Sequence, residues 1–331
     1  IMFDLVVDVG SFKTSICKAG LGVVLEENTL AATSADMKSI VAVGREAKKL
    51  LLSSNDFQPL ALIEKGVIKH RKLLSEMLIS FFQKVIEKKF FKKHSLIFCT
   101  STCLTANEKT QLQNLAYSLN VSKVKLLPAA VLAYVDACYQ TSVRTKIILD
   151  IGSDSTEISL VYDTKILTGC AIGIGGTACD EAIKSILLDK YNLIISSVQA
   201  EQVKREIATL LSNDFITTSV KGYKANSGEE VDVEIKSEDF RAVFEEFFEQ
   251  ILEPLLTFKR ALTTDMVNEL KKGGVFVCGG MANFTGLERF INARLQLPVV
   301  VPLYPESAVM RGAEIALSSA KILDRVLSNN V

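Results

Sequence analysis

The sequence lacks the features that mark a zinc protein, a nucleic-acid binder or a membrane-spanning chain. It holds only two histidines, His70 and His94, so a zinc site is not expected. Lys and Arg together number 38, as do Asp and Glu, whereas a dedicated nucleic-acid binder is usually strongly basic. No apolar stretch reaches the roughly 18 residues that a spanning helix needs. The first four residues carry no basic segment, so no signal peptide is expected.

Two further absences narrow the class of protein. The seven cysteines are odd in number and lack the spacing of a disulfide framework, which predicts free and mostly buried thiols in a reducing cytoplasm. The sequence also has no Gly-x-x-x-x-Gly-Lys-Ser/Thr motif, and this excludes a P-loop NTPase as far as sequence can.

What the sequence does contain is a long α/β pattern. A chain of 331 residues with 48% hydrophobic content favours two domains with sizeable cores. Apolar strand-like runs alternate with helical stripes in both halves, which predicts an α/β architecture. The pattern predicts a helix over 73–88 with an apolar stripe of Leu74, Leu78, Phe81, Phe82 and Val85, and a second helix capped by Asn107. It also predicts a loop over 221–228 and a long helix from Ser237 that Pro254 kinks or breaks.

Two short segments of the chain resemble each other. Asp8-Val-Gly-Ser11 and Asp150-Ile-Gly-Ser153 each follow an apolar run and precede a second strand-like run. Each predicts a strand, a tight turn and a strand, because glycine lets the backbone turn sharply and come close to a ligand. The turn N–H groups and the serine hydroxyl can donate to phosphate oxygens, and the aspartates can hold a hydrated Mg2+. A nucleotide is therefore the leading candidate ligand.

Further motifs in the same order resemble MreB, the bacterial actin of rod-shaped cells, within the actin/Hsp70/sugar-kinase ATPase fold. The resemblance covers nearly the whole chain. It rests on the two hairpins and on segments 22–25 (GVVL), 43–47 (VGREA), 64–68 (EKGVI), 175–183 (GGTACDEAI), 200–204 (AEQVK), 273–280 (GGVFVCGG), 297–299 (LPV) and 311–313 (RGA). It implies two lobes of ribonuclease-H-like mixed sheets with helices on both faces and a nucleotide cleft between them.

The resemblance also implies domain limits and a set of site residues. Lobe I would hold residues 1–143 and 305–331 with a small insert at about 30–69, and lobe II residues 144–304 with an insert at about 184–240. ATP and Mg2+ would be the cofactors, with Asp8 and Asp150 holding the metal through water. The implied nucleotide-binding residues are Asp8, Gly10, Ser11, Phe12, Lys13, Asp150, Gly152, Ser153, Asp154, Ser155, Gly175, Gly176, Glu201, Gln202, Val203, Lys204, Gly279, Gly280, Met281, Ala282 and Asn283.

The sequence departs from the MreB pattern at the phosphate site. MreB proteins usually carry a glutamate before the proline of the connecting segment, where it positions the attacking water, but here Leu127 stands at that place. Leucine can neither orient water nor accept a proton. Asp154 adds a negative charge to the second phosphate turn, unless Mg2+ compensates or the side chain turns away. Lys13 could offset that charge or bind phosphate itself, and Thr177 replaces the first aspartate of the family's Gly-Gly-Asp.

These departures predict a filament subunit that binds nucleotide weakly or hydrolyses it slowly. Thr156 and Glu157 remain available for contacts to water, so a slow ATPase activity is compatible with the sequence. The resemblance implies self-association into filaments and a role in cell shape or wall synthesis with membrane proteins of that machinery. The alternatives are a non-polymerising nucleotide-binding adaptor, or a kinase or chaperone-like ATPase of the same fold.

A final segment suggests membrane contact. Phe90 and Phe91 stand between lysine pairs in residues 88–93 (KKFFKK), where the MreB family has a membrane-inserting loop. The aromatic rings can enter the membrane interface while the lysines meet anionic headgroups, at roughly 1 kcal/mol per basic residue. The alternative is a helix end with both rings in the core. The expected location is the cytoplasm, peripheral at the inner membrane face.

Overall fold

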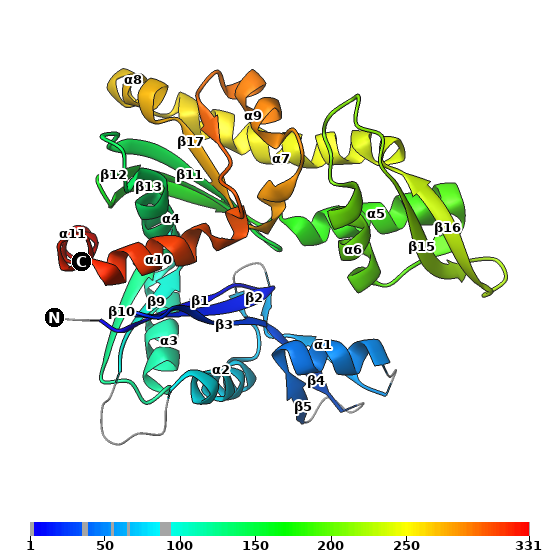
Figure 1. The fold of residues 1–331 in the computed structure, drawn as a ribbon, viewed down its shortest axis with the longest axis horizontal. Coiled ribbons are helices and arrows are strands. Elements are labelled where there is room, and N and C mark those ends of the chain that lie inside the picture. Colours follow the sequence, from blue (N-terminus) through cyan, green and yellow to red (C-terminus); the bar gives the residue numbers. More distant parts are fainter. Residues whose placement is uncertain (1–2, 35–38, 54–55, 65–66, 87–93, 331) are drawn as a thin grey trace. The chain divides into compact units, whose positions relative to one another are not determined.

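A computed structural model gives the fold (Figure 1) and describes residues 3–34, 39–53, 56–64, 67–86 and 94–330. The chain divides into two compact units. Unit 1 holds Ile1–Ile148, Ser159–Ala171 and Ser307–Val331, and unit 2 holds Leu149–Ile158 and Ile172–Glu306. No helix among the described residues is both long and apolar enough to cross a membrane.

The central element of unit 1 is a five-stranded sheet in the order β10-β9-β1-β2-β3. Its strands are β1 (Leu5–Val9), β2 (Lys13–Lys18), β3 (Gly22–Asn28), β9 (Ser95–Thr100) and β10 (Lys123–Pro128). β1, β2 and β3 form an antiparallel meander in which Asp8 faces Ser15, while β9 runs parallel to β1 and to β10. The first hairpin predicted from the sequence is therefore confirmed.

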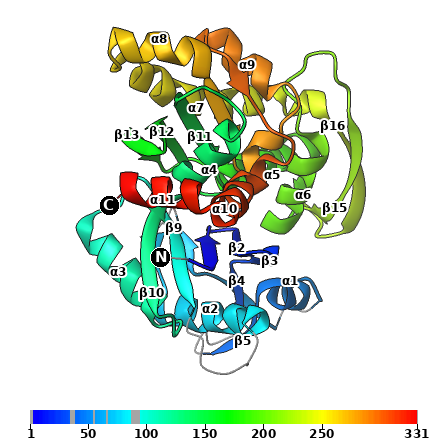
Figure 2. The same cartoon turned by 60° about the vertical axis from the view of Figure 1, so that its left-hand side comes forward.

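Helices cover both faces of this sheet, as Figures 1 and 2 show. On one face lie α2 (Arg71–Val85) and α3 (Ala106–Tyr117), and on the other lie α4 (Ala129–Cys138) and α10 (Ala308–Ser318). The helix predicted over 73–88 is observed over Arg71–Val85, and residues 87–88 lie outside the described residues. Its apolar stripe is confirmed, because Leu74, Leu78, Phe81 and Phe82 are buried in the core of unit 1 and Val85 packs against it partly buried. The last helix, α11 (Ala320–Asn329), follows α10 directly.

The predicted cap of α3 is wrong. Thr105, not Asn107, caps the helix, because its Oγ1 accepts the Glu108 N–H at 3.3 Å while the Glu108 carboxylate accepts the Thr105 N–H at 2.8 Å. This reciprocal arrangement satisfies two N–H groups that the first turn of a helix leaves without intrahelical partners. The Thr-x-x-Glu spacing in the sequence was the signal for it.

Smaller strands complete unit 1 beside α1 (Gly44–Ser53). β4 (Leu30–Thr33) lies between β5 (Ile40–Val43) and β6 (Gln58–Ala61), and β7 (Ile63–Glu64) pairs with β8 (Val67–Ile68). The second five-stranded sheet has the order β13-β12-β11-β17-β18. Its strands are β11 (Thr145–Ile151), β12 (Thr156–Tyr162), β13 (Lys165–Ile172), β17 (Val275–Cys278) and β18 (Val299–Val300), and the division into units passes through the first three.

Unit 2 carries most of the remaining helices. They are α5 (Gly176–Tyr191), α6 (Ser197–Ile207), α7 (Arg241–Arg260), α8 (Thr264–Gly273) and α9 (Leu287–Leu295), with short 3-10 turns η1 (Ser237–Asp239), η2 (Gly280–Asn283) and η3 (Pro305–Ser307). A cluster of phenylalanines packs α7 against the segment that follows η2. Phe244 and Phe248 each place their ring centroid 5.0 Å from that of Phe284 in edge-to-face geometry.

Two expectations in this unit are wrong. The predicted loop over 221–228 begins as strand, because β15 (Thr217–Lys224) pairs with β16 (Glu230–Lys236) and β14 (Leu193–Ile194). Alternating exposure along β15 explains the polar sequence of this strand. The long helix starts at Arg241 rather than Ser237, and it continues through Pro254 without a break.

The crossing of α4 and α10 gives the first prediction. Arg311 forms a bidentate ion pair with Asp136, with Nη2 2.7 Å from Oδ2 and Nε 3.0 Å from Oδ1. A Cβ at the neighbouring Gly312 would lie 1.8 Å from the carbonyl oxygen of Leu132. The two helices therefore meet backbone to backbone at this glycine.

We expect Gly312→Ala to lower the free energy of unfolding by about 2 kcal/mol or more, measured by urea denaturation, because the helices must move apart. In an uncrowded helix the same substitution stabilises by up to about 1 kcal/mol. The sign of the change in unfolding free energy therefore distinguishes a close helix crossing from an uncrowded helix. A stabilised Gly312→Ala variant would contradict the close crossing.

Candidate functional site

The two Asp-x-Gly-Ser turns have the same backbone geometry. In the first, the Gly10 N–H donates to the Lys13 carbonyl at 2.9 Å, and in the second the Gly152 N–H donates to the Ser155 carbonyl at 2.9 Å. A Cβ at either glycine would lie 3.1 Å from that same acceptor oxygen. The strand-turn-strand duplication predicted from the sequence is confirmed within each unit.

In the first turn, Lys13 has a partner within its own sheet. Its Nζ lies 2.6 Å from Oε1 of Glu26 on β3, which Ser15 also contacts through Oγ at 3.4 Å. Both members of the ion pair are partly exposed, so the pair itself contributes little to stability. Phe12 is partly exposed, and Lys48 Nζ lies 5.8 Å from its ring centroid. Phosphate binding by Ser11, Phe12 and Lys13 stays a prediction.

Each predicted magnesium aspartate lies near another segment of its own unit. In unit 1, burial raises the pKa of the Cys99 thiol well above its usual value, and the negative charge of Asp8 raises it further. In unit 2, Gly279 has φ +87°, and a Cβ there would lie 2.4 Å from Oδ1 of Asp150. Only glycine lets the backbone after β17 pass so close to this carboxylate. The shared metal site stays a prediction.

The second turn is bonded directly to the start of α5. The Gly176 N–H donates to the Gly152 carbonyl at 3.0 Å, and the Thr177 N–H donates to the Ser153 carbonyl at 2.7 Å. A Cβ at Gly175 would lie 2.6 Å from the backbone nitrogen of Ser155. The Gly-Gly pair is therefore required for the helix start to lie against the turn.

The extra carboxylate of the second turn has a hydroxyl partner. Thr177 Oγ1 donates to Asp154 Oδ1 at 2.5 Å. Whether the carboxylate turns away from a bound phosphate stays a prediction. The two departures from the family pattern at positions 154 and 177 thus contact each other.

The inner face of α6 carries a buried ion pair. Lys204 is only 8% exposed, and its Nζ lies 2.7 Å from Asp180 Oδ1 on α5. The two groups form an ion pair by distance, but their angles do not meet those of a hydrogen bond. The same Nζ donates to the Gly176 carbonyl at 3.1 Å. Lys204 therefore connects α6 to the residue that anchors the second turn. Asp180 is not among the site residues predicted from the sequence, although it lies one helical turn beyond Gly176.

The other predicted residues of α6 have different surroundings. Glu201 Oε1 lies 2.6 Å from Nη2 of Arg205 on the same helix. Gln202 Nε2 donates to Glu206 Oε1 at 2.9 Å, while Val203 is buried in the core. A nucleotide contact by any of them stays a prediction.

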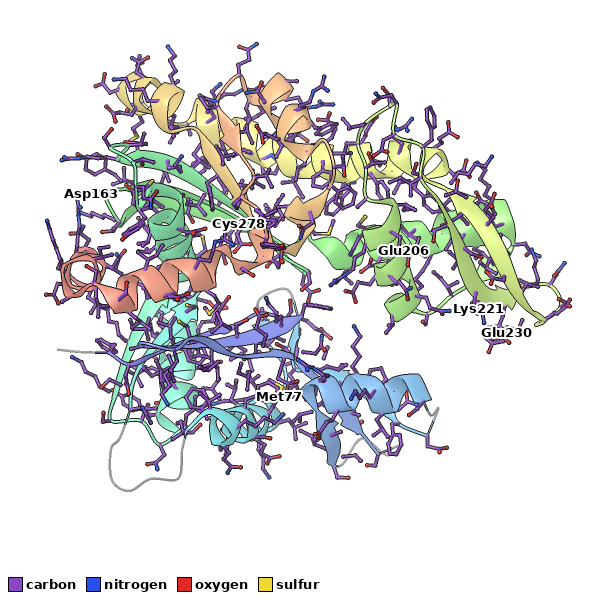
Figure 3. All side chains as sticks on the ribbon, viewed as in Figure 1. Met77, Asp163, Glu206, Lys221, Glu230 and Cys278 are labelled. Atoms are coloured by element: carbon purple, nitrogen blue, oxygen red, sulfur yellow. The ribbon has the colours of Figure 1, made fainter. Side chains whose placement is uncertain are left out.

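The turn after β17 presents an open surface. β17 ends at Cys278, labelled in Figure 3, and the Gly279 N–H then donates to the Pro305 carbonyl at 3.1 Å. Asn283 Nδ2 donates to the Gly280 carbonyl at 3.2 Å and to Glu306 Oε2 at 3.0 Å, while Met281 and Ala282 are buried. A Cβ at Gly280 would meet no atom within 4 Å, so this residue borders open space.

The candidate catalytic residues are not all available for chemistry. Thr156 is buried, and its Oγ1 donates to the Ile174 carbonyl at 2.8 Å. Glu157 is partly exposed at the start of β12. Leu127 is fully buried on β10 beside Cys99, so this position is part of the core of unit 1. Phe90 and Phe91 lie outside the described residues.

Comparison with solved structures defines the class of protein. The fold matches MreB5 of Spiroplasma citri, solved with AMPPNP bound, with a TM-score of 0.89 at 22% identity over 98% of each chain. It also matches the MamK double helical filament with a TM-score of 0.80 at 16% identity, covering 95% of this chain and 99% of that one. The chain therefore has an actin-like fold.

Sequence comparison gives the family. The family model described as MreB/Mbl protein matches residues 2–325, and the chain belongs to this family. It is 25% identical to the cell shape-determining protein MreB of Escherichia coli K12, covering 95% of this chain and 93% of that protein. It is 24% identical to Mbl of Bacillus subtilis 168, covering 98% and 99%. It is an MreB-like cytoskeletal protein of the actin family.

The largely buried carboxyl of Asp180 gives a prediction for the pH dependence of stability. Burial raises its pKa from the usual 3.8 to about 6, although the Lys204 charge opposes this. The folded chain therefore holds this proton more tightly than the unfolded chain. The resulting contribution to stability is complete below about pH 4 and is lost as the pH rises through about 6.

We expect the stability of the wild type relative to Asp180→Asn to fall between pH 4 and pH 7 when both are unfolded in urea without nucleotide. Asp189→Asn, at an exposed position of α5, is the matched control for the loss of one negative charge. A wild-type advantage that grows with pH would contradict the burial of Asp180 as the dominant effect.

Proposed function

We propose that this MreB-like protein binds ATP with Mg2+ and polymerises into filaments. The observation that carries the proposal is the pair of turns with one shared backbone geometry, the second of them bonded to the start of α5. Glycine turns offer backbone N–H groups to anions. MreB5, whose fold is similar, was solved both with AMPPNP and with ADP, and MamK as a double helical filament.

The described residues fit such a ligand. Backbone N–H groups of residues 11–13 and 153–155 are the proposed phosphate donors, and the open space at Gly280 is the proposed place of the adenosine. Asp8 and Asp150 would hold Mg2+ through water, which suits a cation that keeps much of its hydration shell. Bound Mg2+ would supply positive charge against the phosphates. Residues 1–143 with 305–331 and residues 144–304 would form the two lobes around this ligand.

The proposed hydrolysis is slow. A water molecule needs a side chain that orients it or accepts its proton, and Leu127 can do neither. The Thr156 hydroxyl donates to a backbone carbonyl and can still accept a hydrogen bond from water, whereas Glu157 is the candidate whose carboxylate could also accept a proton. Slow hydrolysis would leave filaments in their ATP-bound state for longer.

Gly280 offers a way to test nucleotide binding separately from folding. Because a Cβ there would meet no protein atom within 4 Å, we expect Gly280→Val to leave the melting temperature nearly unchanged while it fills part of the proposed adenosine space. The wild type should form filaments in electron microscopy with ATP and Mg2+, and Gly280→Val should form few or none. Gly228→Asn is the control, because a Cβ there also meets nothing and Asn tolerates the positive φ.

The filament experiment also decides between the proposals for this chain. Wild-type protein that binds ATP but stays monomeric would support a nucleotide-binding adaptor instead. Phosphate release as fast as that of an ordinary bacterial actin, measured side by side, would contradict slow hydrolysis.

The proposed location is the inner face of the cell membrane, where filaments would organise cell shape or wall synthesis with membrane proteins of that machinery. Support comes from the sequence KKFFKK at 88–93 and from the relatives described as cell shape-determining. Two aromatic rings can enter the interface while four lysines meet anionic headgroups.

We expect the variant with Phe90→Ser and Phe91→Ser to lose most of its sedimentation with vesicles that contain anionic lipid. Phe215→Ser is the matched control, because Phe215 is a phenylalanine that is already 67% exposed. Unchanged sedimentation of the double variant would contradict the proposal that this segment contacts the membrane.

A further inference from the structure

Asp154 poses a physical problem for phosphate binding. A carboxylate in the second phosphate turn would repel a polyphosphate, and the repulsion is strong where water is partly excluded. The structure pairs this carboxylate with a group from another segment, since Thr177 Oγ1 donates to Asp154 Oδ1 at 2.5 Å.

Thr177 contacts the turn through two separate groups. Its backbone N–H donates to the Ser153 carbonyl at 2.7 Å, and its hydroxyl holds the next side chain. It is also the second residue of α5, so the carboxylate lies at the positive end of a 16-residue helix dipole. Both the hydroxyl and the helix start therefore stabilise the Asp154 carboxylate in this one orientation.

The residue types at the two positions are matched. An aspartate at 177, as in the family pattern, would place a second carboxylate against Asp154, and like charges at this distance destabilise each other. Valine at 177 would keep the shape and remove the donor. Threonine keeps the branched shape and supplies the hydroxyl that Asp154 needs.

We infer that Thr177 is a positioning residue whose hydroxyl holds the Asp154 carboxylate away from the phosphates, so that the second turn accepts nucleotide despite its added negative charge. This inference rests on the proposed binding of nucleotide. It specifies how the second turn, which differs from the family pattern at Asp154, stays compatible with an anionic ligand.

The test is equilibrium binding of a fluorescent ATP analogue, with and without Mg2+, to the full chain. Thr177→Val should weaken binding at least fivefold, and Thr177→Ser, which keeps the hydroxyl, should stay within about twofold of the wild type. Adding Asp154→Asn to Thr177→Val should restore most of the affinity, because the carboxylate charge is then absent.

A matched control removes a similar hydrogen bond elsewhere in unit 2. Ser219 on β15 donates through Oγ to Asp232 on β16, so Ser219→Ala should leave nucleotide affinity unchanged. Melting temperatures of all variants separate weakened binding from unfolding.

The possible failures are distinct. A wild type that binds no nucleotide overturns the proposed function and this inference together. If the wild type binds and Thr177→Val binds equally well, only the inference fails. A double variant as weak as Thr177→Val shows that Thr177 does not act through Asp154. If Asp154→Asn alone weakens binding only with Mg2+, Asp154 is a metal ligand and the inference is overturned.

Discussion

A polyphosphate can be held by backbone N–H groups only where neither a side chain nor a negative charge stands in the way. The proposed nucleotide binding would apply this constraint to the two Asp-x-Gly-Ser turns, in which one N–H to carbonyl bond of 2.9 Å closes each bend. The glycines at 175 and 279 have a packing reason of their own, because a Cβ there would run into the turn backbone or into Asp150. The chain keeps this geometry even where its side chains depart from the family pattern.

In unit 2 the same constraint extends into the core. The second turn rests on the start of α5, α5 is held to α6 through Lys204, and Lys204 lies against the buried Asp180. A buried ion pair of this kind adds little net stability, because removing both charges from water costs as much as their attraction returns. Its role is better described as geometric. It fixes the Gly176 carbonyl, and with it the helix start that supports the turn.

The sequence predicted what local patterns encode. The hairpins, the apolar stripe of α2 and the α/β order are confirmed, because they depend on residues close together in the chain. It did not predict contacts between distant segments. Asp154 and Thr177 are 23 residues apart, and Asp180 meets Lys204 across two helices. The strand over Thr217–Lys224 was missed because one exposed face makes a strand polar, and the cap of α3 because Thr105 and Asn107 are both capping residue types.

The central claim is that both turns bind one nucleotide. A crystal structure of the protein with AMPPNP and Mg2+ tests it most directly, through the distances from phosphate oxygens to the backbone nitrogens of residues 11–13 and 153–155. The account predicts N–H to oxygen hydrogen bonds of about 3 Å from both turns to the same ligand. A nucleotide bound elsewhere, or one held by a single turn with the other facing solvent, would contradict it.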